Sequence, residues 1–119
     1  MISSKTHAVL DYVVGFLLIG APWILGFADD TAATMVPVIL GASTVVYSLL
    51  TNYEYSFLRV LQYKVHLTID FVAGLLLLAS PWLFGFSDRV YLPHVTVGAF
   101  EIVAVFLSRK NTAQIKEKI

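Results

Sequence analysis

The sequence predicts an all-α integral membrane protein in which two tandem helical hairpins form a four-helix bundle. Three observations lead to this class: the composition, four long apolar segments and an internal repeat. Of the 119 residues, 58% are hydrophobic and only 13% are charged, whereas soluble domains carry roughly 25% charged residues. A soluble chain of this size could not bury so much apolar surface, because small domains bury a limited fraction of their surface. Lipid is therefore expected to cover it.

Four apolar segments are candidate membrane helices: residues 7–27, 35–50, 65–86 and 92–108. A helix needs about 20 residues to cross the hydrocarbon core, within a range of about 17 to 25. The first and third segments fit this length, and the other two fit if they begin close to the interface. We interpret the first segment as a retained membrane helix, because Asp11 interrupts it early and no small-residue cleavage site follows; the alternative is a signal peptide.

The basic residues predict the orientation of the chain. Seven of the eight lie on one side of a four-span arrangement, and only Arg89 lies on the other. The seven are Lys5, Arg59, Lys64, Arg109, Lys110, Lys116 and Lys118. Positive charge favours the cytoplasmic side, so we expect a multi-pass protein of the cell inner (plasma) membrane with cytoplasmic N and C termini. A three-span arrangement would scatter these charges over both sides.

The two halves of the chain are related by a duplication with an offset of 59 residues. The matched pairs are His7 with His66, Asp11 with Asp70, Gly15 with Gly74, Pro22 with Pro81, Trp23 with Trp82, Gly26 with Gly85 and, after a two-residue shortening of the loop, Gly41 with Gly98. Each repeat is a hairpin that crosses the membrane twice, so both copies should have the same orientation. Such parallel repeats are related by a pseudo-two-fold axis along the membrane normal.

The duplication defines four parts of the chain. Residues 1–54 are the first repeat, 55–64 a cytoplasmic connecting loop, 65–108 the second repeat and 109–119 a polar cytoplasmic tail. The pattern H-x3-D, then G, then S/A-P-W-x-x-G-F, then G-A occurs once in each repeat. This pattern resembles the SPW repeat family of small integral membrane proteins. The first copy has Ala21 where the second has Ser80. The resemblance implies a pair of membrane helices per repeat and no established activity.

The repeated histidines and aspartates form the candidate polar or proton site. His7 with Asp11, and His66 with Asp70, are i,i+4 pairs near the cytoplasmic ends of their helices. An unpaired aspartate inside lipid costs about 2.5 to 3.5 kcal/mol. In one interpretation each pair is local and helps to lock the hairpins together. In the other, both pairs meet at the pseudo-two-fold axis, where they could relay protons or bind a divalent metal such as zinc or iron. The sequence alone assigns no metal and no cofactor.

Glu101 is the fifth candidate and breaks the repeat, because its counterpart is Thr44. It lies eight residues before Arg109, about 12 Å from the helix end at 1.5 Å per residue. Asp70 is expected at a similar depth. An ionisable residue at this depth is a functional candidate, and the alternative is a protonated or His66-bonded Glu101 with a structural role.

The repeated glycines, prolines and tryptophans have structural interpretations. Glycines allow close helix packing in lipid, and the alternative is a flexible hinge; the four are Gly15, Gly41, Gly74 and Gly98. The "PWxxGF" residues are expected to end each odd-numbered helix and to anchor it at the outer interface. The alternative is an aromatic ligand-binding box. These residues are Pro22, Trp23, Gly26, Pro81, Trp82 and Gly85.

These observations predict a structural or accessory subunit or scaffold that lies in the lipid bilayer, as a homo-oligomer or within a larger membrane complex. The alternative is a small oligomeric transporter or proton-coupled permease that uses Glu101 and the His/Asp pairs. An intramembrane metal enzyme ranks third, and no catalytic residue is assigned. The chain has no cysteine and no phosphate-binding loop, and its net charge of zero gives no attraction to nucleic acid.

Overall fold

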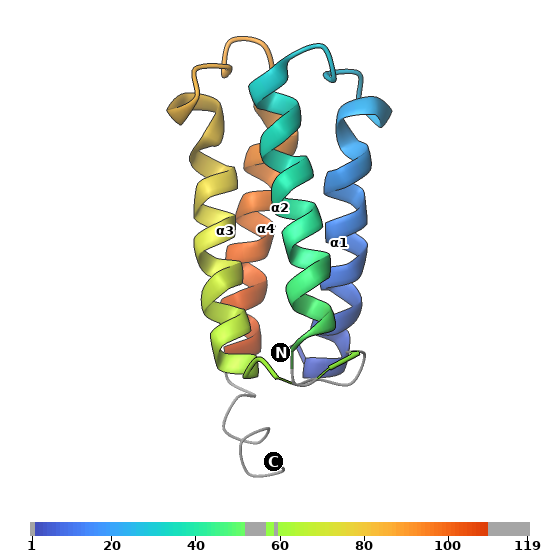
Figure 1. The fold of residues 1–119 in the computed structure, drawn as a ribbon. Helices are drawn as coiled ribbons and strands as arrows, with labels where there is room; N and C mark the ends of the chain where they lie inside the picture. Colours follow the sequence, from blue (N-terminus) through green and yellow to red (C-terminus); the bar gives the residue numbers. More distant parts are fainter. Residues whose placement is uncertain (1, 52–56, 59, 110–119) are drawn as a thin grey trace.

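In the computed structural model, residues 2–51, 57–58 and 60–109 are described, and their regular structure consists of four helices. The helices are α1 (Ser4–Ile24), α2 (Thr31–Leu49), α3 (Tyr63–Leu83) and α4 (Leu92–Arg109). They run up and down in one bundle, with α1 and α3 at diagonally opposite corners (Figure 1). The end that contains the first residue of α1 and the last residue of α4 is here called the lower end, as drawn in Figure 1, and the other is the upper end.

Side-chain caps and left-handed glycines set the helix ends. Asp30 caps α2 by accepting a hydrogen bond from the N–H of Ala33 at 3.0 Å, so α2 begins four residues before the predicted segment 35–50. Gly26 and Gly85 have φ of 79° and 74°, values that end a helix and that glycine adopts at little cost. The predicted segments 7–27 and 65–86 were therefore too long at their C-terminal ends, by three residues each.

Each hairpin is held together by a close approach of two glycines. A Cβ added at Gly41 would lie 2.6 Å from the Gly15 carbonyl oxygen, and one added at Gly98 would lie 2.8 Å from the Gly74 carbonyl oxygen. Real Cβ atoms do not come this close to backbone oxygen atoms. The structure therefore places all four candidate packing glycines where α1 crosses α2 and where α3 crosses α4.

The distribution of side chains is the reverse of that in a soluble bundle. Buried side chains are often small or polar, and they include His7, His66, His94, Thr44 and Ser48. Large apolar side chains instead cover the outside of every helix. Examples with more than half of their surface exposed are Phe16 on α1, Val46 on α2, Val72 on α3 and Phe106 on α4. An apolar patch of this extent needs a lipid or protein neighbour.

Three of the helices, α1, α2 and α3, are long and apolar enough to cross a membrane. The apolar stretch of α4, Leu92–Ser108, is shorter. The class of helical membrane bundle is thus confirmed. The relation of the two hairpins by a pseudo-two-fold axis stays a prediction, as do the limits of the four parts of the chain. The polar tail from residue 110 lies outside the described residues.

Candidate functional site: a buried His/Asp cluster

The four repeated ionisable residues meet in the centre of the bundle near its lower end. The His7 Nε2 atom lies 2.9 Å from Asp70 Oδ2, and His66 Nε2 lies 2.7 Å from Asp11 Oδ2. The contacts within each helix are longer, at 3.2 Å for His7 with Asp11 and 3.1 Å for His66 with Asp70. We call these four residues the His/Asp cluster. Its shortest contacts join the two repeats, so the interpretation of two purely local pairs is wrong.

The helix geometry brings these residues together. Residues four apart lie on the same face of a helix, so each odd-numbered helix directs one histidine and one aspartate to the same side. That side faces the bundle axis in both α1 and α3, which stand at diagonally opposite corners (Figure 1). The polar side chains of α1 and α3 therefore contact one another across the bundle, although the two backbones do not pack directly against each other. All four residues are buried, with at most 7% of their surface exposed.

Two hydroxyl groups contact the Nδ1 atoms of the histidines, on the side of each ring away from the aspartates. His66 Nδ1 lies 2.6 Å from Thr51 Oγ1, just past the end of α2, and His7 Nδ1 lies 2.8 Å from Ser108 Oγ near the end of α4. Thr51 and Ser108 occupy matched positions of the repeat. Each histidine is thus oriented by a hydroxyl from the other repeat.

The Thr51 hydroxyl indicates where the proton of His66 lies. This hydroxyl donates its hydrogen to the Tyr47 carbonyl oxygen at 2.6 Å, so it accepts from His66 and the Nδ1 atom carries a proton. The Nε2 atom that faces Asp11 and Asp70 would then have only a lone pair in a neutral ring. A lone pair cannot lie this close to carboxylate oxygens without a proton or a cation between them.

Tyr47 completes the cluster, and the repeat gave no indication of it. Its hydroxyl donates a short hydrogen bond to Asp70 Oδ1, and its ring packs against His66 with centroids 4.7 Å apart. The matched position in the second repeat is Ala104, so a search for paired residues passes over Tyr47. Its spacing of three residues from Thr44, on a helix whose polar face is buried, is the signal that could have found it.

Glu101 lies beside the cluster and is not bonded to it. A cavity of about 10 Å³ is lined by Glu101, His7, Asp11 and Asp70, together with apolar neighbours. This volume is close to that of one water molecule. Among the residues that the structure describes, none forms a hydrogen bond or an ion pair with the Glu101 side chain. The His66-bonded Glu101 considered from the sequence is therefore not observed.

Ser108, His7 and Asp70 are linked by hydrogen bonds and have the residue types of a hydrolase triad. Their buried surroundings are unsuited to that chemistry. The Ser108 side chain is completely buried, and the adjoining cavity has room for one water molecule only. In the corresponding set from the other repeat, which is Thr51, His66 and Asp11, the Thr51 hydroxyl donates its hydrogen to a backbone carbonyl and not to the histidine. A nucleophile needs a base that takes its proton and space for a substrate. The arrangement can instead hold protons or bind a small cation.

The "PWxxGF" copies lie at the upper end. Trp23 and Trp82 have 64% and 60% of their surface exposed, and they stand on the outside of α1 and α3. The Ser80 hydroxyl donates to the Leu77 carbonyl oxygen at 2.7 Å. That carbonyl lacks its usual helical donor because residue 81 is proline and has no N–H. The serine of the motif thus repairs a bond that its proline removes, whereas Ala21 cannot do so in the first copy.

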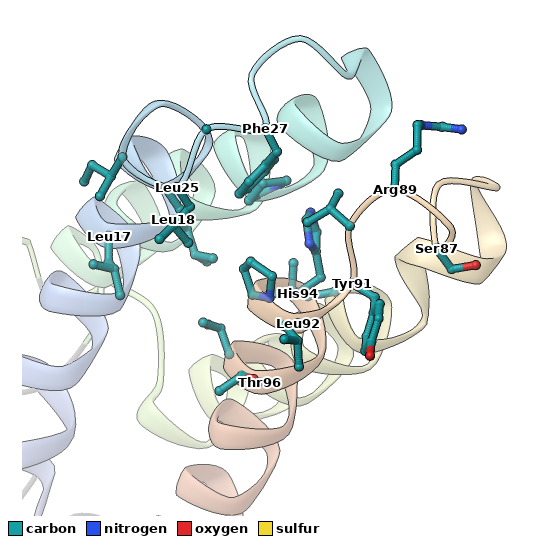
Figure 2. Close-up of a pocket in the computed structure, with 18 of the residues that line it drawn as sticks. Leu17, Leu18, Leu25, Phe27, Ser87, Arg89, Tyr91, Leu92, His94 and Thr96 are labelled. Carbon is teal, nitrogen blue, oxygen red and sulfur yellow. The ribbon is translucent and has the colours of Figure 1, made fainter.

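An apolar cavity of about 800 Å³ also opens at the upper end (Figure 2). Leu18 and Leu25 line one side, and Leu92 and Thr96 of α4 line the other. Neither tryptophan of the repeat lines this cavity, whereas Gly26 and Phe27 of the first motif copy do. The aromatic ligand-binding box stays a prediction. The size is that of a small-molecule site.

His94 borders this cavity and is the buried histidine that the sequence reasoning did not select. Its Nε2–H donates to the Ala33 carbonyl oxygen at 2.9 Å. Its ring lies between Phe27 and Phe86, with centroids 5.2 and 4.8 Å away. This hydrogen bond crosses from α4 to α2, so His94 helps to join the two hairpins at their upper end.

The loops of the upper end carry an exposed ion pair between Asp30 and Arg89. The pKa of Asp30 is lowered, first by the backbone N–H of Ala33 and then by the Arg89 side chain. The same contact raises the pKa of Arg89. The Arg89 side chain is 54% exposed, so solvent and salt screen this pair.

Comparison with known proteins yields one match. A family model described as SPW repeat domain matches residues 5–108. This range covers the four helices almost completely and contains the whole His/Asp cluster. No curated protein and no solved structure matches the chain.

Proposed function

The chain belongs to the SPW repeat domain family, and we propose that it is a structural or accessory subunit of a membrane assembly. The observation that carries this proposal is the reversed distribution of side chains. Polar groups bond to one another inside the bundle, while large apolar side chains cover every helix on the outside. The outer faces carry the exposed apolar side chains and are therefore the surface that a partner subunit would contact.

The absence of cysteine allows a direct test of this proposal. Single cysteines are introduced at one outward position per helix, and native membranes are treated with an oxidant or a short bifunctional reagent. The positions are Phe16, Val46, Val72 and Phe106. The matched control is Val14, of which 8% is exposed. We expect cross-linking from at least one outward position and none from the control.

Extraction into lipid nanodiscs followed by native mass spectrometry identifies the neighbour. A defined oligomer or a reproducible complex is the expected result. A monomer surrounded only by lipid, together with no cross-link from any of the four positions, would overturn the subunit proposal.

We further propose that the lower end faces the cytoplasm and that the membrane is the cell inner (plasma) membrane. Lys5 and Lys64 lie there, whereas Arg89 at the upper end is paired with Asp30. Membranes retain positive charge on the cytoplasmic side. The proposal requires α4 to cross the membrane, which its position alongside α3 over the length of the bundle supports (Figure 1).

The orientation is tested with a membrane-impermeant maleimide on intact cells. A cysteine at Asp88, whose side chain is 79% exposed, should be labelled directly. A cysteine at Lys5 should be labelled only after permeabilisation. The opposite pattern would reverse the orientation.

Transport by an oligomer is a second candidate, and the position of Glu101 favours it. This carboxyl shares a cavity with three members of the His/Asp cluster and bonds to none of the described residues. It is therefore available to exchange protons or ions. In proteoliposomes, Glu101→Gln should abolish proton or ion flux if the protein transports. Equal flux in the wild type and this variant would eliminate the role of Glu101.

A further inference from the structure

We propose that His7, Asp11, His66 and Asp70 form a binding site for one divalent transition-metal ion of the zinc class. This site goes beyond the subunit role and does not depend on it. Its ligands would be the two Nε2 atoms and one oxygen of each carboxylate. Imidazole and carboxylate together suit zinc and iron, whereas calcium and magnesium prefer oxygen ligands alone.

The four ligand atoms already surround a common centre. They all lie within 4.8 Å of one another, and the histidine–aspartate contacts are 2.7 to 3.2 Å. Two ligands about 2.0 Å from a tetrahedral ion are about 3.3 Å apart. Side-chain movements of about an ångström, which lengthen the shortest contacts and shorten the longest separations, would therefore admit the ion.

The hydroxyl groups orient the histidines as metal ligands need. A metal-bound imidazole commonly donates its other N–H to an outer partner, which fixes the tautomer. Thr51 and Ser108 stand in this position at the two Nδ1 atoms. The Thr51 hydroxyl must accept from His66, because it donates to a carbonyl. In this tautomer of the neutral ring, the inward Nε2 atom of His66 directs a lone pair to the centre of the cluster, where it can bind a cation.

A central cation would satisfy all of the contacts at the same time. Each Nε2 atom can carry one proton, yet each lies within 3.2 Å of oxygen atoms from two carboxylates. An N–H shared between two oxygen atoms points directly at neither and makes weaker bonds. A cation at the centre interacts with all four ligand atoms together. Its two positive charges would balance those of Asp11 and Asp70, which is needed for charged groups so deeply buried.

Tyr47 and the small cavity beside Glu101 also suit a metal site. Tyr47 bonds to the Oδ1 atom of Asp70 and leaves Oδ2 facing the centre. The cavity of about 10 Å³ between the cluster and Glu101 has room for one water molecule. That water could be a further ligand of the ion and could bond to Glu101.

The test uses the full-length protein in mild detergent. The protein is stripped with a chelator, confirmed as helical by circular dichroism and titrated with Zn²⁺. We expect one zinc per chain by elemental analysis and a higher unfolding temperature with zinc. Co²⁺ should give the visible absorption of a four-coordinate site. A helical wild-type protein that binds less than stoichiometric zinc would overturn the proposal.

Variants assign the bound metal to the cluster. Asp11→Asn and His66→Gln should lose the stoichiometric ion. Thr51→Val, which removes only an outer partner, should weaken zinc binding by about 10 to 100-fold. The control is His94→Gln, which changes the remaining buried histidine and should still bind one ion. Loss of zinc in this control, or unchanged affinity in both Thr51→Val and His66→Gln, would contradict the proposed site.

Discussion

The lower and upper ends of the bundle both join the two hairpins through ionisable side chains, yet in opposite surroundings. At the lower end His7, Asp11, His66 and Asp70 are buried and contact one another. At the upper end the pair of Asp30 and Arg89 joins two loops, and the Arg89 side chain is 54% exposed. The difference predicts that breaking a contact is costly where its partner would be left buried and unpaired, and costs little where solvent can replace the lost partner. Four experiments test this comparison.

Breaking the buried cluster should have the largest effect. Asp11→Ala removes the partner that lies 2.7 Å from His66, and it leaves two histidines facing one carboxylate. Breaking a buried ion pair by removing one member costs about 3 to 5 kcal/mol. We expect a loss of that order in the free energy of unfolding, measured by denaturant titration in mixed micelles. A loss no larger than that of an exposed variant such as Thr68→Ala would contradict the importance of the cluster.

Packing within each hairpin should come next. Gly41→Ala places a Cβ 2.6 Å from the Gly15 carbonyl oxygen, so α1 and α2 must separate. Overpacking of this kind costs about 1 to 3 kcal/mol. Gly20→Ala is the control, because its Cβ would meet only the flexible end of Ile24 at 3.3 Å. Equal unfolding temperatures for the two variants would show that the hairpins tolerate separation.

The two copies of the proline motif should differ in stability, because only the second copy has a serine that forms an extra hydrogen bond. Ser80→Ala leaves the Leu77 carbonyl without the donor that replaces the missing N–H of Pro81. A hydrogen bond contributes about 0.5 to 1.5 kcal/mol, and we expect a decrease of that size in stability. The reciprocal change Ala21→Ser should stabilise the first copy. Unchanged or higher stability in Ser80→Ala, together with no stabilisation in Ala21→Ser, would refute the role of the serine.

The exposed pair at the upper end should have the smallest effect, and it should depend on pH and salt. The pKa of Asp30 is lowered in the folded protein. Its contribution is therefore present above the ordinary aspartate pKa of about 3.9 and is lost as the pH falls through the lowered folded value. Arg89→Gln should reduce this dependence without removing it, because the N–H of Ala33 still bonds to Asp30, and it should leave the unfolding temperature at neutral pH and high salt unchanged. A large shift at high salt would show that the pair is not screened.

Much of the fold follows from the sequence because hydropathy and repetition are local properties. The four apolar segments, the paired glycines and the SPW pattern are visible without coordinates. The helix ends were less well predicted, because Gly26 and Gly85 end their helices inside an apolar run that continues to Phe27 and Phe86. Hydropathy does not register a change of backbone conformation.

The sequence by itself determined which residues are available for a site. The repeat selects two histidines and two aspartates, and it places them at the same depth on α1 and α3. Only the tertiary structure decided that these residues meet each other across the repeats, with Thr51, Ser108 and Tyr47 around them. The reason is physical: helical spacing orients a side chain about its own axis, whereas contact between α1 and α3 depends on how four helices pack.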